Sequence, residues 1–163
     1  MIHTEIQINA PPSAVREAFL DFPSLPTYHT TFIKTITPHD PSKNGPTLSP
    51  GDKLSCLIGN MSFSTVVETN SPAEFTWRGT LGSTAFFTGA HHFKFLAVHS
   101  DGDGDGDGDC DGGAEEKTRF VHGEEFGGVL AGVFGLFGRE GTKRGFERIN
   151  EDLKTFVEGK YGR

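Results

Sequence analysis

The stretch TRFVHGEEF (residues 118–126) has a close counterpart upstream in FTGAHHFKF (87–95). In both, aromatic or ionisable residues recur at every second position, which is the period of a β-strand whose successive side chains point to opposite faces. The alternation predicts one shared face with these members: Gly89, His91, Phe93 and Phe95 from one strand, and Phe120, His122, Glu124 and Phe126 from the other. An isolated buried carboxylate is costly, so we expect Glu124 to be paired with one of these histidines or with Arg78.

Further strands and helices surround this pair of strands. Alternation predicts strands at 2–8, 32–38, 53–59, 61–70 and 71–81, with a hairpin turn at Gly59–Asn60. Prolines predict a short helix within 10–22, followed at 23–30 by a turn or a second short helix. A long amphipathic helix is predicted at the end of the chain from apolar residues at steps of three and four: Phe146, Ile149, Leu153, Phe156 and Val157. This order of elements predicts an α+β fold, a curved antiparallel sheet wrapped around the C-terminal helix.

The stretch DGDGDGDGDCDGG (101–113) looks like a metal-binding loop. An EF-hand calcium loop needs glycine at its sixth position and glutamate at its twelfth, and the registers that start at Asp105 and Asp107 each miss one of the two. Low-complexity Gly/Asp sequence buries no apolar surface and repels itself. We therefore expect a single domain over 1–163 in which 101–116 is a flexible acidic loop between two strands, with weak cation binding as the alternative.

Charge and composition exclude several classes of function. The formal net charge is −7, but eight of the 22 acidic residues lie in 101–116 and the rest nearly balance the 15 lysines and arginines. No basic stripe is present, so nucleic acid is not an expected partner. Two cysteines, Cys56 and Cys110, are too few for a disulfide scaffold or a cysteine-rich zinc site. No nucleotide, hydrolase or dinucleotide fingerprint occurs, and no cofactor is expected.

Two stretches of the sequence bear on export and membrane insertion. The first residues, MIHTEIQINAPPSAV, lack the basic and apolar regions of a secretory signal. The apolar run 126–138 is too short and too rich in glycine to span a bilayer. We therefore predict a cytoplasmic protein without an integral membrane segment.

Four stretches carry a family pattern: FTW (75–77), GAHHFKF (89–95), TRFVHGEEFGGVL (118–130) and GFERINEDLKTFVE (145–158). With them the chain resembles the START-like (SRPBCC) superfamily, in its polyketide cyclase/dehydrase and lipid transport branch. The matching positions are Trp77, Gly89, His91, Phe93, Thr118, Arg119, His122, Glu124, Phe126, Gly128, Asn150, Leu153 and Lys154. The resemblance covers nearly the whole chain and departs from the family mainly at the insertion 101–113. A tryptophan common in the family is Tyr28 here.

The resemblance implies a helix-grip fold with two short helices after the first strand. In that fold a bent sheet and the long helix enclose an elongated cavity for an apolar or aromatic ligand. We therefore predict a protein that binds a hydrophobic or aromatic small molecule, lipid or polyketide-like. The candidate ligand-binding residues are Tyr28, Phe63, Trp77, Phe93, Phe126 and Phe137.

Other interpretations of the polar residues on this face stay open. In a cyclase or dehydratase, Glu124 would act as general acid and base together with His122 or His91. Alternatively, the three side chains form a hydrogen-bonded cluster that only stabilises the sheet. By ligand type the same three could hold zinc, although nothing in their spacing requires a metal. An interaction module that uses the outer surface is a further possibility, without a motif to support it.

Glycines recur every three or four residues before and within the predicted C-terminal helix, at Gly132, Gly135, Gly138, Gly141 and Gly145. Glycine in a helix costs about 1 kcal/mol relative to alanine, so we expect a compensating reason. A mobile gate, room for a ligand, and tight packing against the sheet are the three explanations.

Overall fold

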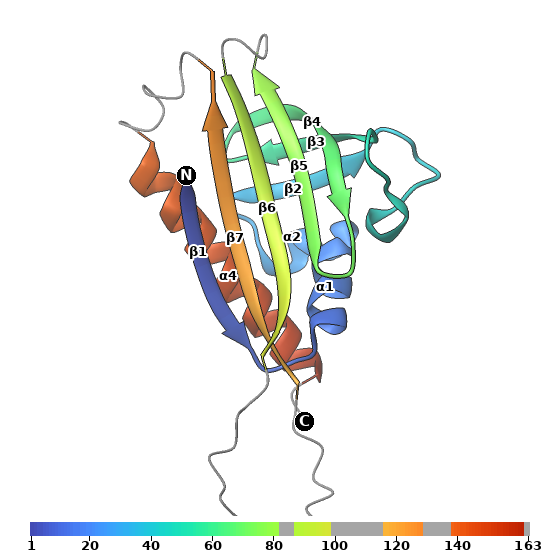
Figure 1. Ribbon diagram of the computed structural model, residues 1–163, viewed down its shortest axis with the longest axis vertical. Coiled ribbons are helices and arrows are strands. Elements are labelled where there is room, and N and C mark those ends of the chain that lie inside the picture. Colours follow the sequence, from blue (N-terminus) through green and yellow to red (C-terminus); the bar gives the residue numbers. More distant parts are fainter. Residues whose placement is uncertain (82–86, 99–115, 129–137, 162–163) are drawn as a thin grey trace, which may run out of the picture.

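The computed structural model describes residues 1–81, 87–98, 116–128 and 138–161 (Figure 1). They form one seven-stranded antiparallel sheet in the order β1-β7-β6-β5-β4-β3-β2. The strands are β1 Ile2–Ile8, β2 Ile33–Pro38, β3 Lys53–Ile58, β4 Met61–Asn70, β5 Glu74–Leu81, β6 Phe87–Val98 and β7 Lys117–Gly127. The helices are α1 Pro12–Leu20, η1 Phe22–Ser24, α2 Leu25–Tyr28, η2 Gly45–Thr47 and α4 Arg139–Tyr161.

This arrangement confirms the predicted α+β class. The long helix α4 lies behind β1 and β7, and β2 and β3 run nearly crosswise to β6, so the sheet curls around one face (Figure 1). The predicted short helices follow β1, and the predicted turn at Gly59–Asn60 joins β3 to β4. Gly59 has a φ of 59°, a left-handed conformation that favours glycine. Residues 101–115 of the predicted acidic loop lie outside the described residues.

The register of the central strands organises the concave face of the sheet into rows. Phe75, Phe93 and His122 are neighbours across β5, β6 and β7. The next row is Trp77, His91 and Glu124, and the one after it is Gly79, Gly89 and Phe126. The shared face predicted for β6 and β7 is therefore confirmed.

Helix α1 fills one half of this concave face with aromatic side chains. The ring of Phe19 lies 4.4 Å from that of Phe93, 6.0 Å from Phe120 and 6.2 Å from Phe75, centroid to centroid. All four side chains are almost fully buried. Aromatic pairs at such distances add stability beyond the area that they bury. This half of the sheet is solid core.

Helix α4 packs on the same concave face, over β1 and β7, and protects the edge of the sheet. Side chains of α4 bond to the outer backbone of the edge strand β1: Lys154 Nζ donates to the carbonyl of Gln7 at 2.8 Å, and Glu158 accepts from the amide of Asn9 at 2.7 Å. Such contacts reduce the pairing of an edge strand with other chains. In the interior, the buried Asn150 donates to Thr4 Oγ1 at 3.0 Å. The helix is therefore fixed to the sheet by polar bonds as well as by its apolar face.

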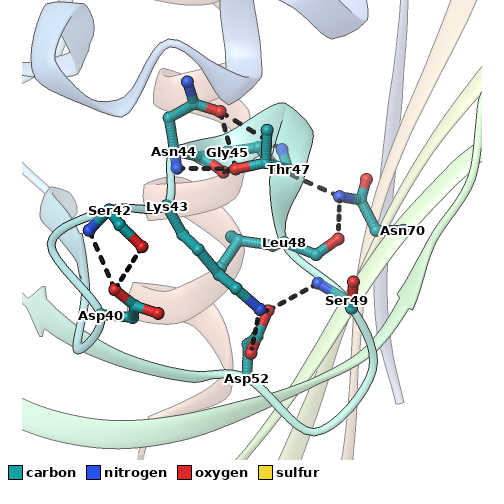
Figure 2. Close-up of polar contacts among 10 residues, drawn as sticks. All are labelled: Asp40, Ser42, Lys43, Asn44, Gly45, Thr47, Leu48, Ser49, Asp52 and Asn70. Atoms are coloured by element: carbon teal, nitrogen blue, oxygen red, sulfur yellow. Dashed lines mark hydrogen bonds and ion pairs between the residues drawn. The ribbon is translucent and has the colours of Figure 1, made fainter.

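The connection between β2 and β3, residues 39–52, is held by its own polar contacts (Figure 2). The side chain of Asn70 donates to the carbonyls of Gly45 and Leu48 at 3.1 and 2.8 Å. Lys43 Nζ donates to both carboxylate oxygens of Asp52, at 2.7 and 2.6 Å. These bonds, two of them from Asn70 of β4, order a long connection.

The packing of α4 against the rest of the fold can be tested at Gly145. An added Cβ at Gly145 would fall on the ring of Phe32, whereas at Gly141 it would meet nothing within 4 Å. We expect Gly145→Ala to lower the free energy of unfolding by roughly 1–3 kcal/mol, the usual cost of overpacking. Gly141→Ala should be neutral or raise it by up to about 1 kcal/mol through helix propensity. Urea unfolding measures both, and equal effects of the two substitutions would contradict tight packing at Gly145.

Candidate functional site

A cavity of about 240 Å³ lies where the aromatic core ends. The β3–β4 hairpin, the concave face of β5–β7 and the start of α4 enclose it. Its larger apolar lining residues are Phe32, Ile58, Met61, Phe63, Trp77 and Phe126. His91 and Glu124 supply the ionisable groups.

Two glycines leave room for this cavity. Gly79 and Gly89 are cross-strand neighbours, and both line it. A Cβ at Gly79 would lie 3.3 Å from Thr65 Cγ2, and one at Gly89 would lie 2.6 Å from Glu124 Oε1. The second distance is below any normal contact, so the carboxylate of Glu124 occupies the space that the missing side chain of Gly89 leaves. Only glycine at position 89 allows this placement.

The carboxylate of Glu124 is paired with His91. Nε2 of His91 lies 2.9 Å from Oε1 of Glu124, and the two side chains are 6% and 9% exposed. The residues are direct partners across β6 and β7, so the sheet register itself holds the pair together. The partner expected for Glu124 is therefore His91, whereas Arg78 pairs with Glu68 at 2.6 Å.

His122 lies one row deeper and is fully buried. Its ring stacks on Phe146 at 3.7 Å between centroids and lies 4.5 Å from the ring of Phe93. Burial lowers the pKa of His122 well below its usual value, the nearby His91 and His29 lower it further, and Asn150 partly opposes the shift. His122 therefore stays neutral where an exposed histidine would be protonated.

Two polar nitrogen atoms in the cavity wall have no hydrogen-bond partner within the described part of the chain. They are the indole nitrogen Nε1 of Trp77 and Nδ1 of His91. The Trp77 ring lies 5.4 Å from the His91 ring, in the same cross-strand row. Both atoms have almost no accessible surface, so a molecule in the cavity does not reach them unless the wall rearranges.

Of the residues predicted for the site, the structure brings five together at the cavity and places three elsewhere. Lining the cavity are Phe63, Trp77, His91, Glu124 and Phe126. Phe93 and His122 lie in the packed row below it. Tyr28 stacks on Phe156 of α4 at 4.5 Å, away from the cavity, and burial raises the pKa of its hydroxyl. Phe137 lies outside the described residues, as do Gly132 and Gly135.

Sequence reasoning did not find the contacts that hold Phe32 at the cavity wall. The amide of Phe32 donates to Nε2 of His29 at 3.0 Å, which leaves Nδ1 of His29 to donate to Asp152 of α4 at 2.7 Å. In this arrangement Nε2 of His29 accepts from the Phe32 amide, and Nδ1 faces the carboxylate of Asp152. His29 and Asp152 are 123 positions apart, and neither belongs to a recognisable motif. No local pattern could have paired them.

Metal binding and membrane insertion find no support in the described ranges. No group of three or more His, Cys, Asp or Glu side chains there is arranged to hold a metal ion. Within the same ranges, no helix combines the length and apolarity that crossing a bilayer requires. Cys56 is buried, and burial raises the pKa of its thiol to about 11, so it is a poor nucleophile.

The neutral state of His122 predicts a pH-dependent stability. Below its usual pKa of 6.5 the unfolded chain binds a proton at His122, and the folded chain does not until the lowered pKa is reached. Over that window stability falls with falling pH, by up to about 1.4 kcal/mol per pH unit from this residue. We expect His122→Gln to remove this part of the slope in urea unfolding below about pH 6.5. His3→Gln, at an exposed histidine, is the control and should leave the slope unchanged. Equal slopes for wild type and His122→Gln would contradict the assignment.

The sequence matches a family model, and the fold matches solved structures. The model of a family described as polyketide cyclase/dehydrase and lipid transport matches residues 1–158. No curated protein matches the sequence. Hypothetical protein jhp0584 from Helicobacter pylori is similar in structure, with a TM-score of 0.70 and 14% identity over 95% of this chain and 86% of its own.

Two further structures with this fold are named as aromatase/cyclases. The Zhui aromatase/cyclase from Streptomyces sp. R1128 has a TM-score of 0.64 and 11% identity, over 96% of this chain and 92% of its own. The di-domain ARO/CYC StfQ of the steffimycin biosynthetic pathway has a TM-score of 0.61 and 10% identity, over 100% of this chain and 47% of its own. At such identities these structures show the fold alone. The match of the family model over nearly the whole sequence confirms the resemblance: the chain belongs to the polyketide cyclase/dehydrase and lipid transport family.

Proposed function

We propose that this protein binds an apolar or aromatic small molecule, lipid or polyketide-like, in the cavity between the β3–β4 hairpin, the sheet and α4. The observation that carries the proposal is a hollow of about 240 Å³ beside a tightly packed aromatic core. The apolar lining meets water where the hollow opens, and covering such surface with an apolar ligand is favourable. A hollow that the sheet register maintains therefore favours a ligand that fills it.

The lining has the composition of a small-molecule site. Such sites are mostly apolar, with a few polar groups that orient the ligand. Phe63, Trp77 and Phe126 supply aromatic surface, while His91 and Glu124 supply polar groups. Family membership and the aromatase/cyclase names of two similar structures favour a polyketide-like aromatic ligand over other apolar molecules.

Binding can be tested with N-phenyl-1-naphthylamine, an uncharged probe whose fluorescence rises in apolar surroundings. We expect saturable binding with energy transfer from Trp77, the only tryptophan. Phe63→Ala removes a ring from the cavity wall and should weaken binding by about tenfold, since burying such a side chain is worth roughly 1.5–3 kcal/mol.

Val66→Ala is the matched control, because Val66 lies on the same strand, is exposed and does not line the cavity. It should leave the affinity unchanged. A probe signal that does not saturate, or equal weakening by the two substitutions, would exclude this cavity as the binding site.

A second candidate function is acid–base catalysis, which the contact of His91 with Glu124 at 2.9 Å favours. We infer that Glu124 would take a proton from a carbon next to a carbonyl group, or assist the loss of water, while His91 stabilises its carboxylate. General acid–base help of this kind is typically worth about 10²–10⁴-fold in rate.

Exchange of deuterium into 2-tetralone tests this without knowledge of the natural substrate, because only the abstraction and return of a proton are needed. An enzyme should accelerate the exchange, as followed by NMR, and Glu124→Gln should remove the acceleration by about 10²-fold or more. Glu125→Gln removes the same charge at an exposed position and is the control, which should keep the acceleration. If 2-tetralone binds and wild type and Glu124→Gln exchange it at the same rate, the protein is a binding protein only.

A further inference from the structure

We propose that the ligand of this cavity carries a positively charged amine on its apolar or aromatic body, and that the amine binds the carboxylate of Glu124. The proposal rests on the proposed binding function and narrows its ligand class. Three features of the cavity carry it: the position of the carboxylate, the unused capacity of one carboxylate oxygen, and the charge of the residues around it.

The carboxylate of Glu124 lies at the surface of the cavity rather than behind it. Gly89 lines the cavity, and a Cβ on Gly89 would lie only 2.6 Å from Oε1 of Glu124. The carboxylate therefore occupies the place that a side chain at position 89 would take. Glu124 also keeps an exposure of 7%, whereas Trp77 in the same wall has none. A molecule in the cavity can therefore reach the carboxylate.

One oxygen of this carboxylate has hydrogen-bonding capacity left. Oε1 of Glu124 contacts Nε2 of His91 at 2.9 Å, and Oε2 forms no hydrogen bond with the residues that the structure describes. Unlike Nε1 of Trp77 and Nδ1 of His91, Oε2 is not among the unpartnered atoms that have almost no accessible surface. An ionised carboxylate has about four sites that accept hydrogen bonds. Glu124 can therefore accept a hydrogen bond from a donor in the cavity.

No basic side chain accompanies Glu124 in the described lining. Glu124 and His91 are the only ionisable residues there, and none of the described lining residues is lysine or arginine. The ranges 82–86, 99–115 and 129–137 contain no lysine or arginine either. A buried carboxylate without a positive partner is costly. A ligand that brings a positive charge would reduce that cost.

Two lysines next to the cavity along the chain have partners at exposed positions. Lys34 donates to Oδ1 of Asn60 at 3.1 Å in an exposed contact. Lys143 follows the lining residue Thr142 and pairs with Glu147 at 3.6 Å, and both of these side chains are more than half exposed. Water and salt screen charges at such positions. These lysines therefore leave the charge of Glu124 uncompensated inside the cavity.

Three kinds of ligand group can be compared at this carboxylate. A second carboxylate meets a like charge in surroundings of low dielectric constant, where repulsion is strong. A hydroxyl group donates a hydrogen bond but leaves the negative charge in place. An ammonium group donates a hydrogen bond and supplies the opposite charge, and hydrogen bonds between two ionised groups are among the strongest. Because the cavity opens to solvent, the ammonium group also loses less hydration than in a closed interior.

Three probes with one ring system test this: 2-naphthylmethylamine, which is protonated at neutral pH, the uncharged 2-naphthalenemethanol, and 2-naphthoate, which is ionised. Isothermal titration calorimetry at pH 7.5, where a free imidazole is mostly neutral, measures each affinity for the wild-type protein. We expect 2-naphthylmethylamine to bind about tenfold or more tighter than the alcohol, because it alone neutralises Glu124. We expect 2-naphthoate to bind about tenfold weaker than the alcohol, because its charge faces Glu124.

Glu124→Gln removes the charge and keeps the shape, so the preference for the amine over the alcohol should fall by about tenfold or more. Glu125→Gln changes the net charge equally at the adjacent, exposed position, and should keep the preference. This control separates binding at the cavity from a general attraction of cations to a chain with a net charge of −7. Circular dichroism verifies the fold of each variant, and the wild-type series stands without either.

The possible failures are distinguishable. If the three probes bind within a few-fold of one another, or if the alcohol or 2-naphthoate binds tightest, the ligand class is wrong and the binding function stands. Equal loss of the preference in Glu124→Gln and Glu125→Gln would also overturn the ligand class, because it would assign the preference to surface charge. If none of the three probes binds, and N-phenyl-1-naphthylamine also fails to bind, both the ligand class and the proposed function are overturned.

Discussion

The carboxylate of Glu124 is almost entirely removed from water, and the arrangement around it reduces the cost of that burial. An unpaired buried carboxylate would be strongly destabilising, so a partner and space are both required. The register of β6 and β7 supplies the partner, because it places His91 directly opposite. Gly89, one row away, supplies the space. A shift of one residue between these strands would turn Glu124 to the other face and remove both.

The same sheet face serves stability at one end and binding at the other. Phe19 of α1 reaches the rows that contain Phe93 and Phe120, and there the interior is filled. It does not extend to the row of Gly79 and Gly89, where the missing side chains leave a hollow. Because one half of the face is filled and the other is open, the fold keeps a packed core and still has room for a ligand. Removing a ligand from such a site would leave the packed half intact.

Much of this could be predicted from the sequence, because alternation within a strand determines which face a residue occupies. The pairing of Glu124 with a histidine followed from that face and from the cost of burying charge. Alternation does not tell how far along the strand the helices reach. It therefore could not separate Phe93, in the filled half, from Trp77, beside the cavity. The bond of His29 to Asp152 joins segments 123 positions apart, and only the folded chain brings them together.

The central claim is that Trp77 and Glu124 line a ligand cavity rather than closed core. Since the chain has one tryptophan, its indole N–H gives one signal in a proton–nitrogen correlation spectrum. Titration with 2-naphthol should move this signal in a saturable way, because the ring system of a bound ligand lies beside Trp77. An indole signal that stays in place up to the solubility limit of 2-naphthol would contradict the account.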